Sequence, residues 1–348
     1  MATKNRPAQR RIDPRRTPQK SAQKPGQGTG QTAAQRKSGS KSGRPGGQRP
    51  QAATVAQATT RDWIAGARIR TLPLAIAPVA VGTGAAYLFD NDSGWHWVRA
   101  LLCLAVAIFL QIGVNYANDY SDGIRGTDAY RVGPSRLTGS GAAQPRTVLR
   151  VAIVFFALAG FAGVVVSIRS GFPWLIAVGA ACIVAAYFYT GGKHPYGYYA
   201  LGEVFVFVFF GLVATAGTMF VQVGTVSFDA WLGAVAVGLF ACAVLMVNNI
   251  RDAEQDKLAK KRTLAVLLGY WRSRVLFAIF ALVPFAILAY FTILFPYALY
   301  VYFALLAAVP AAIITLTGRS APEFVLALKL TSFAALLFGL GLGAALAF

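Results

Sequence analysis

The fold of this chain is decided by stretches such as residues 228–257, which read FDAWLGAVAVGLFACAVLMVNNIRDAEQDK. After its second position this stretch carries no charge until Arg251, and a helix of about 20 apolar residues is long enough to cross a hydrocarbon core roughly 30 Å thick. Carboxylates then follow at Asp252, Glu254 and Asp256. The stretch predicts a membrane-spanning helix that ends in an acidic cluster.

Similar apolar runs recur along the 348-residue chain, of which 56% is hydrophobic and only 13% charged. This composition argues against a water-soluble two-domain enzyme with an ordinary charged surface. Only Phe295 and Pro296 separate the seventh run from the eighth, so eight spans is the alternative to nine. We expect an all-α membrane protein with about nine transmembrane helices, at residues 71–89, 97–118, 147–168, 173–190, 200–222, 228–250, 275–294, 297–316 and 325–348.

The amino-terminal segment differs in composition from the rest. Residues 1–62 contain 14 Lys and Arg residues against Asp13 and Asp62, and they have almost no large apolar side chains. Such a segment buries too little surface to offset its ordering entropy. We predict a disordered basic cytoplasmic tail over residues 1–61, resting on anionic lipid headgroups, and a transmembrane domain over residues 62–348. The tail lacks the apolar region of a signal peptide, an organellar transit peptide is the alternative, and nucleic-acid binding is not expected.

Basic residues are concentrated in the loops after the even-numbered spans, and the loops after the odd-numbered spans contain few. By the positive-inside rule, we expect the tail and the even-numbered loops on the cytoplasmic side of the plasma membrane. The carboxyl terminus is then outside. The three cysteines lie inside apolar spans without CxxC spacing, so neither a disulfide nor a zinc site is expected from Cys103, Cys182 and Cys242.

Two acidic segments end the second and the sixth span and look like an internal repeat. In the first, Asn115 precedes Asp119 by four residues, as Asn248 precedes Asp252 in the second. This step places an amide oxygen above a carboxylate on one helix face. Four spans separate the segments, so both should emerge on the same cytoplasmic face. Each oxygen-lined stripe continues with one more carboxylate, Asp122 or Asp256.

Carboxylates that face one another at the end of a helix bundle repel unless a positive charge lies between them. Mg²⁺ binds oxygen ligands and is usually held by one or two carboxylates together with substrate phosphate oxygens. Solvated helix ends would be the alternative interpretation, but both clusters lie within the membrane boundary, where carboxylates are costly. The segments therefore predict a metal-diphosphate site, with basic residues nearby to bind phosphate: Arg125, Arg136, Lys193, Arg251 and Lys257.

Further short motifs accompany the acidic segments: RIRTLP from Arg68, GPSRL from Gly133, YTGG from Tyr189, PYGY from Pro195, LGE from Leu201 and KRTLAV from Lys261. With them the chain resembles the UbiA superfamily of intramembrane aromatic prenyltransferases over roughly residues 62–348. The similarity is greater to its MenA branch, which prenylates 1,4-dihydroxy-2-naphthoate. The general superfamily pattern of the first segment is NDxxDxxxD, which would place the last acid at position 126. Here position 126 is Gly and the last acid is displaced to Asp128.

The resemblance implies a nine-helix bundle around a central cavity that opens sideways to lipid under a cytoplasmic cap. It also implies the reaction. Mg²⁺ on the diphosphate of a polyprenyl diphosphate helps that group leave, and the allylic cation alkylates 1,4-dihydroxy-2-naphthoate with loss of carbon dioxide, giving demethylmenaquinone for menaquinone biosynthesis. Neutralising charge that develops on a leaving group is electrostatic catalysis. Membrane lipid would surround the prenyl chain.

The roles that the resemblance implies are assigned residue by residue. The predicted catalytic metal ligands are Asp119, Asp122, Asp252 and Asp256, with Asn115, Asn118 and Asn248 completing or orienting the shell. Arg136, Lys193, Arg251 and Lys257 are predicted to bind the diphosphate, or else to be interfacial anchors. Arg68 and Arg70 would hold the acceptor's carboxylate or a phosphate. Tyr189 and Tyr196 would shield the allylic cation. Glu203 is either a base or a partner of Lys193.

Other classes of protein are less consistent with the sequence. A secondary transporter would favour inverted repeats or an ionisable group near the bilayer midplane, whereas here the acids gather at one face. A metal channel would need a polar path to the other side, which the apolar spans do not offer. Within the enzyme class, the alternative is a UbiA-type enzyme for another aromatic acceptor, such as 4-hydroxybenzoate.

Overall fold

The computed structural model describes residues 57–90, 96–127 and 136–348. Within these ranges the chain is almost entirely helical, and the one β-type pairing is an isolated bridge between Tyr199 and Arg262. Residues 1–56 of the tail predicted over residues 1–61, and Asp128, lie outside the described residues, whereas Thr60 and Arg61 of that tail belong to the first helix. The all-α class expected from the apolar runs is confirmed.

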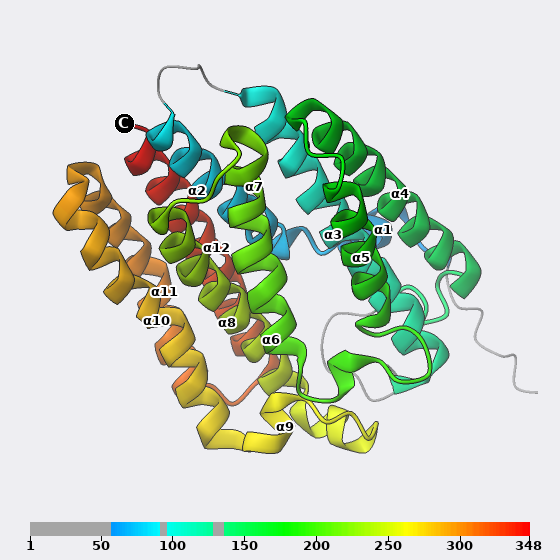
Figure 1. Cartoon of the computed structure of the whole chain (residues 1–348). Coiled ribbons are helices and arrows are strands. Elements are labelled where there is room, and N and C mark those ends of the chain that lie inside the picture. Colours follow the sequence, from blue (N-terminus) through cyan, green and yellow to red (C-terminus); the bar gives the residue numbers. More distant parts are fainter. Residues whose placement is uncertain (1–56, 91–95, 128–135) are drawn as a thin grey trace, which may run out of the picture. The chain divides into compact units, whose positions relative to one another are not determined.

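The helices follow one another in a simple order (Figure 1). The first half contains α1 (Thr60–Gly66), the 3₁₀ turn η1 (Ile69–Thr71), α2 (Pro73–Phe89), α3 (Trp97–Ile124), α4 (Pro145–Ser170) and α5 (Leu175–Phe188). The second half contains η3 (Tyr196–Tyr198), α6 (Gly202–Val206), η4 (Phe207–Val213), α7 (Ala214–Val223), α8 (Phe228–Leu258), α9 (Leu264–Leu268), α10 (Tyr270–Leu294), η5 (Pro296–Ala304), α11 (Leu305–Thr317) and α12 (Ala321–Ala347).

Each of the nine predicted ranges contains an apolar helix, but not all are long enough to count as spans. Among the described residues, seven helices are long and apolar enough to cross a membrane, and the pair Thr60–Thr71 and Pro73–Phe89, bent by 44°, brings the number to eight. The remaining helix, α5, has only 14 residues. The chain is therefore a multi-pass membrane protein, while the predicted count of nine is not confirmed. The break at Phe295 does separate two helices.

Small residues allow the central helices to approach closely. In Figure 1, α2, α8 and α12 lie side by side, and α12 packs more extensively on α2 than on any other helix. A side chain at Gly339 would lie 2.5 Å from Ala77, and one at Gly343 would lie 2.4 Å from the Ala80 carbonyl oxygen. Close backbone contact between small residues is the usual way in which membrane helices associate. These helices form the closely packed side of the bundle.

The helix from α6 to α7 is continuous but contains a π-helical segment, η4. At its centre Gly211 lies against α8, where an added Cβ would come within 2.7 Å of the Ala234 carbonyl oxygen and of Gly238. π-Helical turns are rare and occur frequently at functional sites. In this chain the segment places Phe209, Phe210 and Val213 on the wall of an internal cavity.

Candidate active site

The acidic ends of α3 and α8 are brought together by Tyr198 of η3, before α6, and by Lys261, in the segment between α8 and α9. The Tyr198 hydroxyl donates a hydrogen bond of 2.6 Å to Asp122 Oδ1 on α3. The Lys261 ammonium lies 3.6 Å from Asp256 Oδ1 on α8 and 5.2 Å from the centre of the Tyr198 ring. Asp122 and Asp252 both lie within electrostatic range of Asp256. The predicted convergence of the two acidic segments is thus seen in the structure.

Asp122 is the most heavily contacted carboxylate of the first segment. Its side chain is buried, and Oδ2 lies 2.5 Å from Arg136 Nη1, which also donates to the backbone carbonyl of Asn118 at 2.9 Å. Its other oxygen accepts the Tyr198 hydroxyl. Burial and the Asp122 charge raise the pKa of Tyr198 above its usual range, so that the hydroxyl stays protonated as a donor. Arg136, expected at the diphosphate, therefore lies at the acidic site.

Asp119, only three residues earlier on α3, has different partners. Its Oδ2 accepts the backbone N–H of Leu137 at 3.0 Å, and its Oδ1 accepts that of Thr138 at 2.9 Å. A carboxylate that accepts two buried amides holds their loop in place. In the structure Asp119 therefore anchors the loop that carries Arg136, although the sequence predicted a metal ligand at this position.

On α8 a single arginine organises the second segment. Arg251 donates to Asp252 through Nε at 2.7 Å and through Nη2 at 2.6 Å, and Nη2 also donates to Asn248 Oδ1 at 2.7 Å. Its third nitrogen, Nη1, is buried and has no hydrogen-bond partner among the described residues, and the same holds for Asp256 Oδ2. These two atoms, a donor and an acceptor, can therefore bind a ligand at this end of the bundle.

Next to the acidic ends is the polar end of a cavity of about 510 Å³, which we call its mouth. The polar residues at the mouth include Arg68, Arg70, Asn115, Asn118 and Asn248. Like Asn248, the other two asparagines are fixed by hydrogen bonds: Asn115 Nδ2 donates to the Ala67 carbonyl at 2.9 Å, and Asn118 Oδ1 accepts the Thr190 hydroxyl at 2.6 Å. The amide and guanidinium groups predicted at the substrate therefore share one opening.

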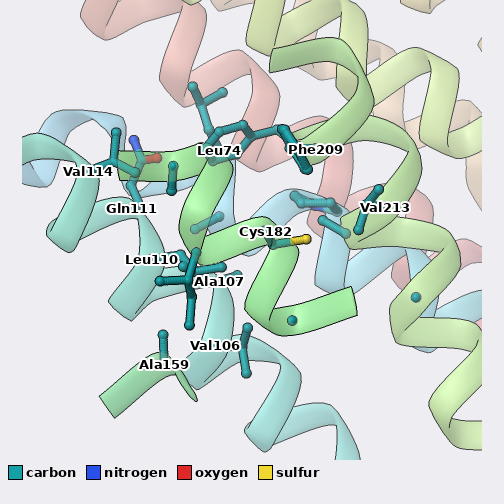
Figure 2. A pocket seen from close by; sticks show the side chains of 18 of the residues that line it. Leu74, Val106, Ala107, Leu110, Gln111, Val114, Ala159, Cys182, Phe209 and Val213 are labelled. Atoms are coloured by element: carbon teal, nitrogen blue, oxygen red, sulfur yellow. The ribbon is translucent and has the colours of Figure 1, made fainter. Parts of the chain in front are cut away.

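The wall of the cavity beyond the mouth is mainly apolar. Figure 2 shows Leu74, Val106, Leu110, Phe209 and Val213 around this space. Gln111 contributes an amide side chain to the same wall. Two aromatic residues predicted near the allylic cation also line it: Tyr189 and Tyr196, whose ring centres are 5.5 Å apart. The wall is built from α2, α3, α4, α5, α8 and the helix from α6 to α7.

Some predicted residues lie elsewhere. Lys193 is exposed, and Lys257 forms an exposed ion pair with Glu254 at 2.8 Å. Arg125 donates to the carbonyls of Thr190 and Gly192. These three cations are not brought to the cavity mouth in the structure.

Glu203 has a different partner from the one considered in the sequence. It is 4% exposed and accepts a hydrogen bond of 3.0 Å from Asn249 Nδ2, so it does not pair with Lys193. Its other oxygen is buried without a hydrogen-bond partner in the described part of the chain.

Sequence reasoning missed Tyr198 and Lys261 as site residues. Both lie in motifs that carry the family resemblance, PYGY and KRTLAV. Nothing in these motifs indicates that they meet, because their contact requires the segment before α6 to pair with the segment after α8. The structure shows that pairing: Arg262 N–H donates to the Tyr198 carbonyl at 3.0 Å.

Comparison with known proteins supplies the family. Residues 75–333 match the UbiA prenyltransferase family. The chain belongs to this family. Among the relatives of this UbiA-family chain is the 1,4-dihydroxy-2-naphthoate octaprenyltransferase of Mycobacterium tuberculosis, 48% identical over 291 residues, which are 84% of this chain and 98% of that protein. The enzyme of the same name from Mycobacterium leprae is 44% identical over 83% of this chain and 97% of that protein.

A solved UbiA-family structure shares the fold. A UbiA homologue from Archaeoglobus fulgidus, bound to GPP and Mg²⁺, superposes with a TM-score of 0.55 at 17% identity, over 82% of this chain and 99% of that one. The family predicted from the acidic segments, and the branch indicated by the flanking motifs, are therefore both confirmed.

Proposed function

We propose that this UbiA-family protein transfers a polyprenyl group from polyprenyl diphosphate to 1,4-dihydroxy-2-naphthoate, with release of carbon dioxide, giving demethylmenaquinol, the reduced form of demethylmenaquinone, for menaquinone biosynthesis. The observation that carries the proposal is the apolar cavity of about 510 Å³ whose mouth adjoins the acidic ends of α3 and α8. The apolar wall of the cavity can hold a prenyl chain, and the polar groups at its mouth can bind the anionic diphosphate head. The near full-length similarity to two mycobacterial enzymes of this name supports the choice of acceptor.

The acidic site fits a divalent cation only together with substrate. In the described ranges, no group of three or more His, Cys, Asp or Glu side chains is close enough to hold an ion. Mg²⁺ commonly takes one or two carboxylates and completes its shell with water and phosphate oxygens. Asp256 Oδ2, buried without a hydrogen-bond partner among the residues described, is a suitable first ligand. We assign Asp256 to the ion as a direct ligand, and Asp122 and Asp252 as ligands through water; the ion would neutralise the leaving diphosphate.

The cations of the site bind the remaining diphosphate charge in this proposal. Arg136 is held by Asp122, and Arg251 by Asp252, so both guanidinium groups are preorganised instead of having to be ordered by the substrate. Arg251 Nη1 is the donor left over for phosphate. Lys261, beside Asp256, adds a third positive charge.

The acceptor is placed at the mouth, where Arg68 and Arg70 can pair with its carboxylate. Arg70 Nε is buried and has no hydrogen-bond partner in the residues described. Tyr189 and Tyr196 line the cavity between this mouth and the apolar wall, where their ring faces can stabilise the allylic cation. The allylic C–O bond then breaks with its electron pair going to diphosphate, and the carbon forms its new bond to the ring. The ring–carboxylate bond breaks with its electron pair returning to the ring, and carbon dioxide leaves.

The same proposal includes the setting. The acidic end of the bundle faces the cytoplasm, and the protein lies in the plasma membrane, since the basic loops gather at that end. A prenyl chain is soluble only in lipid. A site within the membrane lets the chain stay in apolar surroundings while its diphosphate head meets the metal and the acceptor at the aqueous boundary.

The test is a product assay with the purified full-length protein in detergent, geranylgeranyl diphosphate, Mg²⁺ and either 1,4-dihydroxy-2-naphthoate or 4-hydroxybenzoate. Prenylated naphthoquinone with the first acid is the expected result. Product only with the second acid would support the alternative acceptor. Prenylation of neither acid, with solute or ion flux in liposomes, would overturn the proposal in favour of transport.

A further inference from the structure

The cavity extends far beyond the polar mouth. Asn118 and Cys103 both line it, and on one helix a rise of 1.5 Å per residue separates them by about 22 Å. Thr218 of α7 lies beside Cys103 at the distant end. The cavity thus extends along about half of the length of α3, and its wall away from the mouth is mainly apolar.

Three glycines line this distant part, one on each of three helices: Gly163 on α4, Gly179 on α5 and Gly217 on α7. An added Cβ at Gly179 or Gly217 would meet no atom within 4 Å, and at Gly163 it would meet only Val106 Cγ2, at 4.0 Å. Helix packing therefore does not require glycine at any of the three positions.

Glycines at helix crossings in the same bundle behave differently. A Cβ at Gly82 would lie 2.4 Å from the Thr215 carbonyl oxygen, and one at Gly233 would lie 2.6 Å from Val81. Close contact between helices explains why glycine is needed at these two positions. Close contact does not explain the glycines at positions 163, 179 and 217, although glycine inside a helix lowers helix stability by about 1 kcal/mol relative to alanine. What they preserve is the open volume of the cavity.

In the proposed function the prenyl chain of the donor lies along this cavity; we propose that Gly163, Gly179 and Gly217 form its distal wall, which sets how long a chain binds inside. The proposal rests on the proposed prenyl-transfer function and adds a subsite to it. A side chain at one of these positions fills space that the distal isoprene units need. The reacting head, about 20 Å away at the mouth, is left unaffected.

The decisive comparison is between short and long donors in variants of two glycines. Gly179→Leu and Gly217→Leu are assayed with geranyl and geranylgeranyl diphosphate and one acceptor. We expect the ratio of kcat/KM for the long donor to that for the short donor to fall at least about tenfold, as when a methylene-sized group is excluded from an apolar pocket.

A matched control is available on the same helix. Ala177 of α5 is exposed and does not line the cavity, so Ala177→Leu should leave the donor ratio unchanged. Binding of a non-hydrolysable geranylgeranyl diphosphate analogue, measured by calorimetry with detergent-solubilised protein, gives a readout independent of turnover. The leucine variants should weaken it by a similar factor, and Ala177→Leu should not.

Each outcome decides a separate question. An unchanged donor ratio and unchanged analogue binding in folded leucine variants would overturn the distal-wall assignment. If the leucine variants do not fold, Gly179→Ala and Gly217→Ala replace them, with an expected loss of about threefold for the long donor only; no loss would overturn the assignment. A wild-type protein that binds the analogue but prenylates neither aromatic acid refutes the proposed function instead.

Discussion

The hydroxyl of Tyr198 donates a hydrogen bond of 2.6 Å to the carboxylate of Asp122, although 76 positions separate the two residues in the sequence. The same tyrosine ring lies 5.2 Å from the ammonium of Lys261, which pairs with Asp256. The segment between α5 and α6 and the segment after α8 therefore connect the two acidic helix ends. This connection fixes the distance between the carboxylates before any substrate is bound.

Removing a carboxylate from the proposed metal site should abolish most of the activity. Asp122→Asn and Asp252→Asn are each expected to lower turnover at least about a hundredfold, because an interaction with charge developing in the transition state is lost. Asp229→Asn is a control on the opposite end of α8, where Asp229 accepts a hydrogen bond from Tyr290. Turnover near the wild-type value in Asp122→Asn would contradict the assignment.

Asp119→Asn separates the loop-anchoring role from metal binding. An asparagine can offer only one acceptor oxygen to the amides of Leu137 and Thr138, and a buried N–H left without a partner costs about 1–3 kcal/mol. We expect a lower melting temperature and a higher KM for the donor, because Arg136 loses its support. The Mg²⁺ concentration for half-maximal activity should stay constant; a large increase would show that Asp119 is a ligand instead.

Tyr198→Phe removes one hydrogen bond from Asp122 and leaves the ring beside Lys261. We expect turnover to fall about tenfold, the size of a hydrogen bond to a charged group. Tyr199→Phe is the matched control, since Tyr199 is exposed and its hydroxyl lies 3.4 Å from His194. Equal effects of the two substitutions in the steady-state assay would argue against the bridging role of Tyr198.

Chelation tests the cofactor directly. Excess EDTA should eliminate product formation, and adding Mg²⁺ beyond the chelator should restore it, because the diphosphate is a poor leaving group until its charge is neutralised. The melting temperature should change little, since the ion pairs of Arg136 and Arg251 hold the carboxylates without it. Full turnover in chelator would be incompatible with a metal-dependent reaction.

Deleting residues 2–56 should leave turnover within about twofold of the full chain, since the tail was predicted to lie outside the bundle. The cut is placed before Ala58, whose N–H donates to the Ala142 carbonyl, and before Thr59, which caps α1. The product assay and a melting curve of both proteins check this. A folded but inactive truncation would give the tail a role in the reaction.

Much of the fold was accessible from the sequence. Long uncharged runs identified where the helices cross the membrane, because apolar length and charge are properties of a single segment. The repeated Asn-to-Asp spacing in turn located the acidic site at one end of the bundle. The break at Phe295 was also expected from Pro296, which cannot donate a backbone hydrogen bond. Pro78, Pro284 and Pro310 nevertheless lie inside helices, so the proline alone does not decide the break.

The contacts of each charged side chain were decided only by the tertiary structure. Asp119 and Asp122 stand three positions apart in one motif, yet one anchors a loop and the other joins Arg136 and Tyr198. Lys257 was predicted at the site, but Lys261 is the lysine that reaches Asp256. The physical reason is that a carboxylate's role depends on its partners, and these partners come from segments far along the chain that meet only when the bundle has formed.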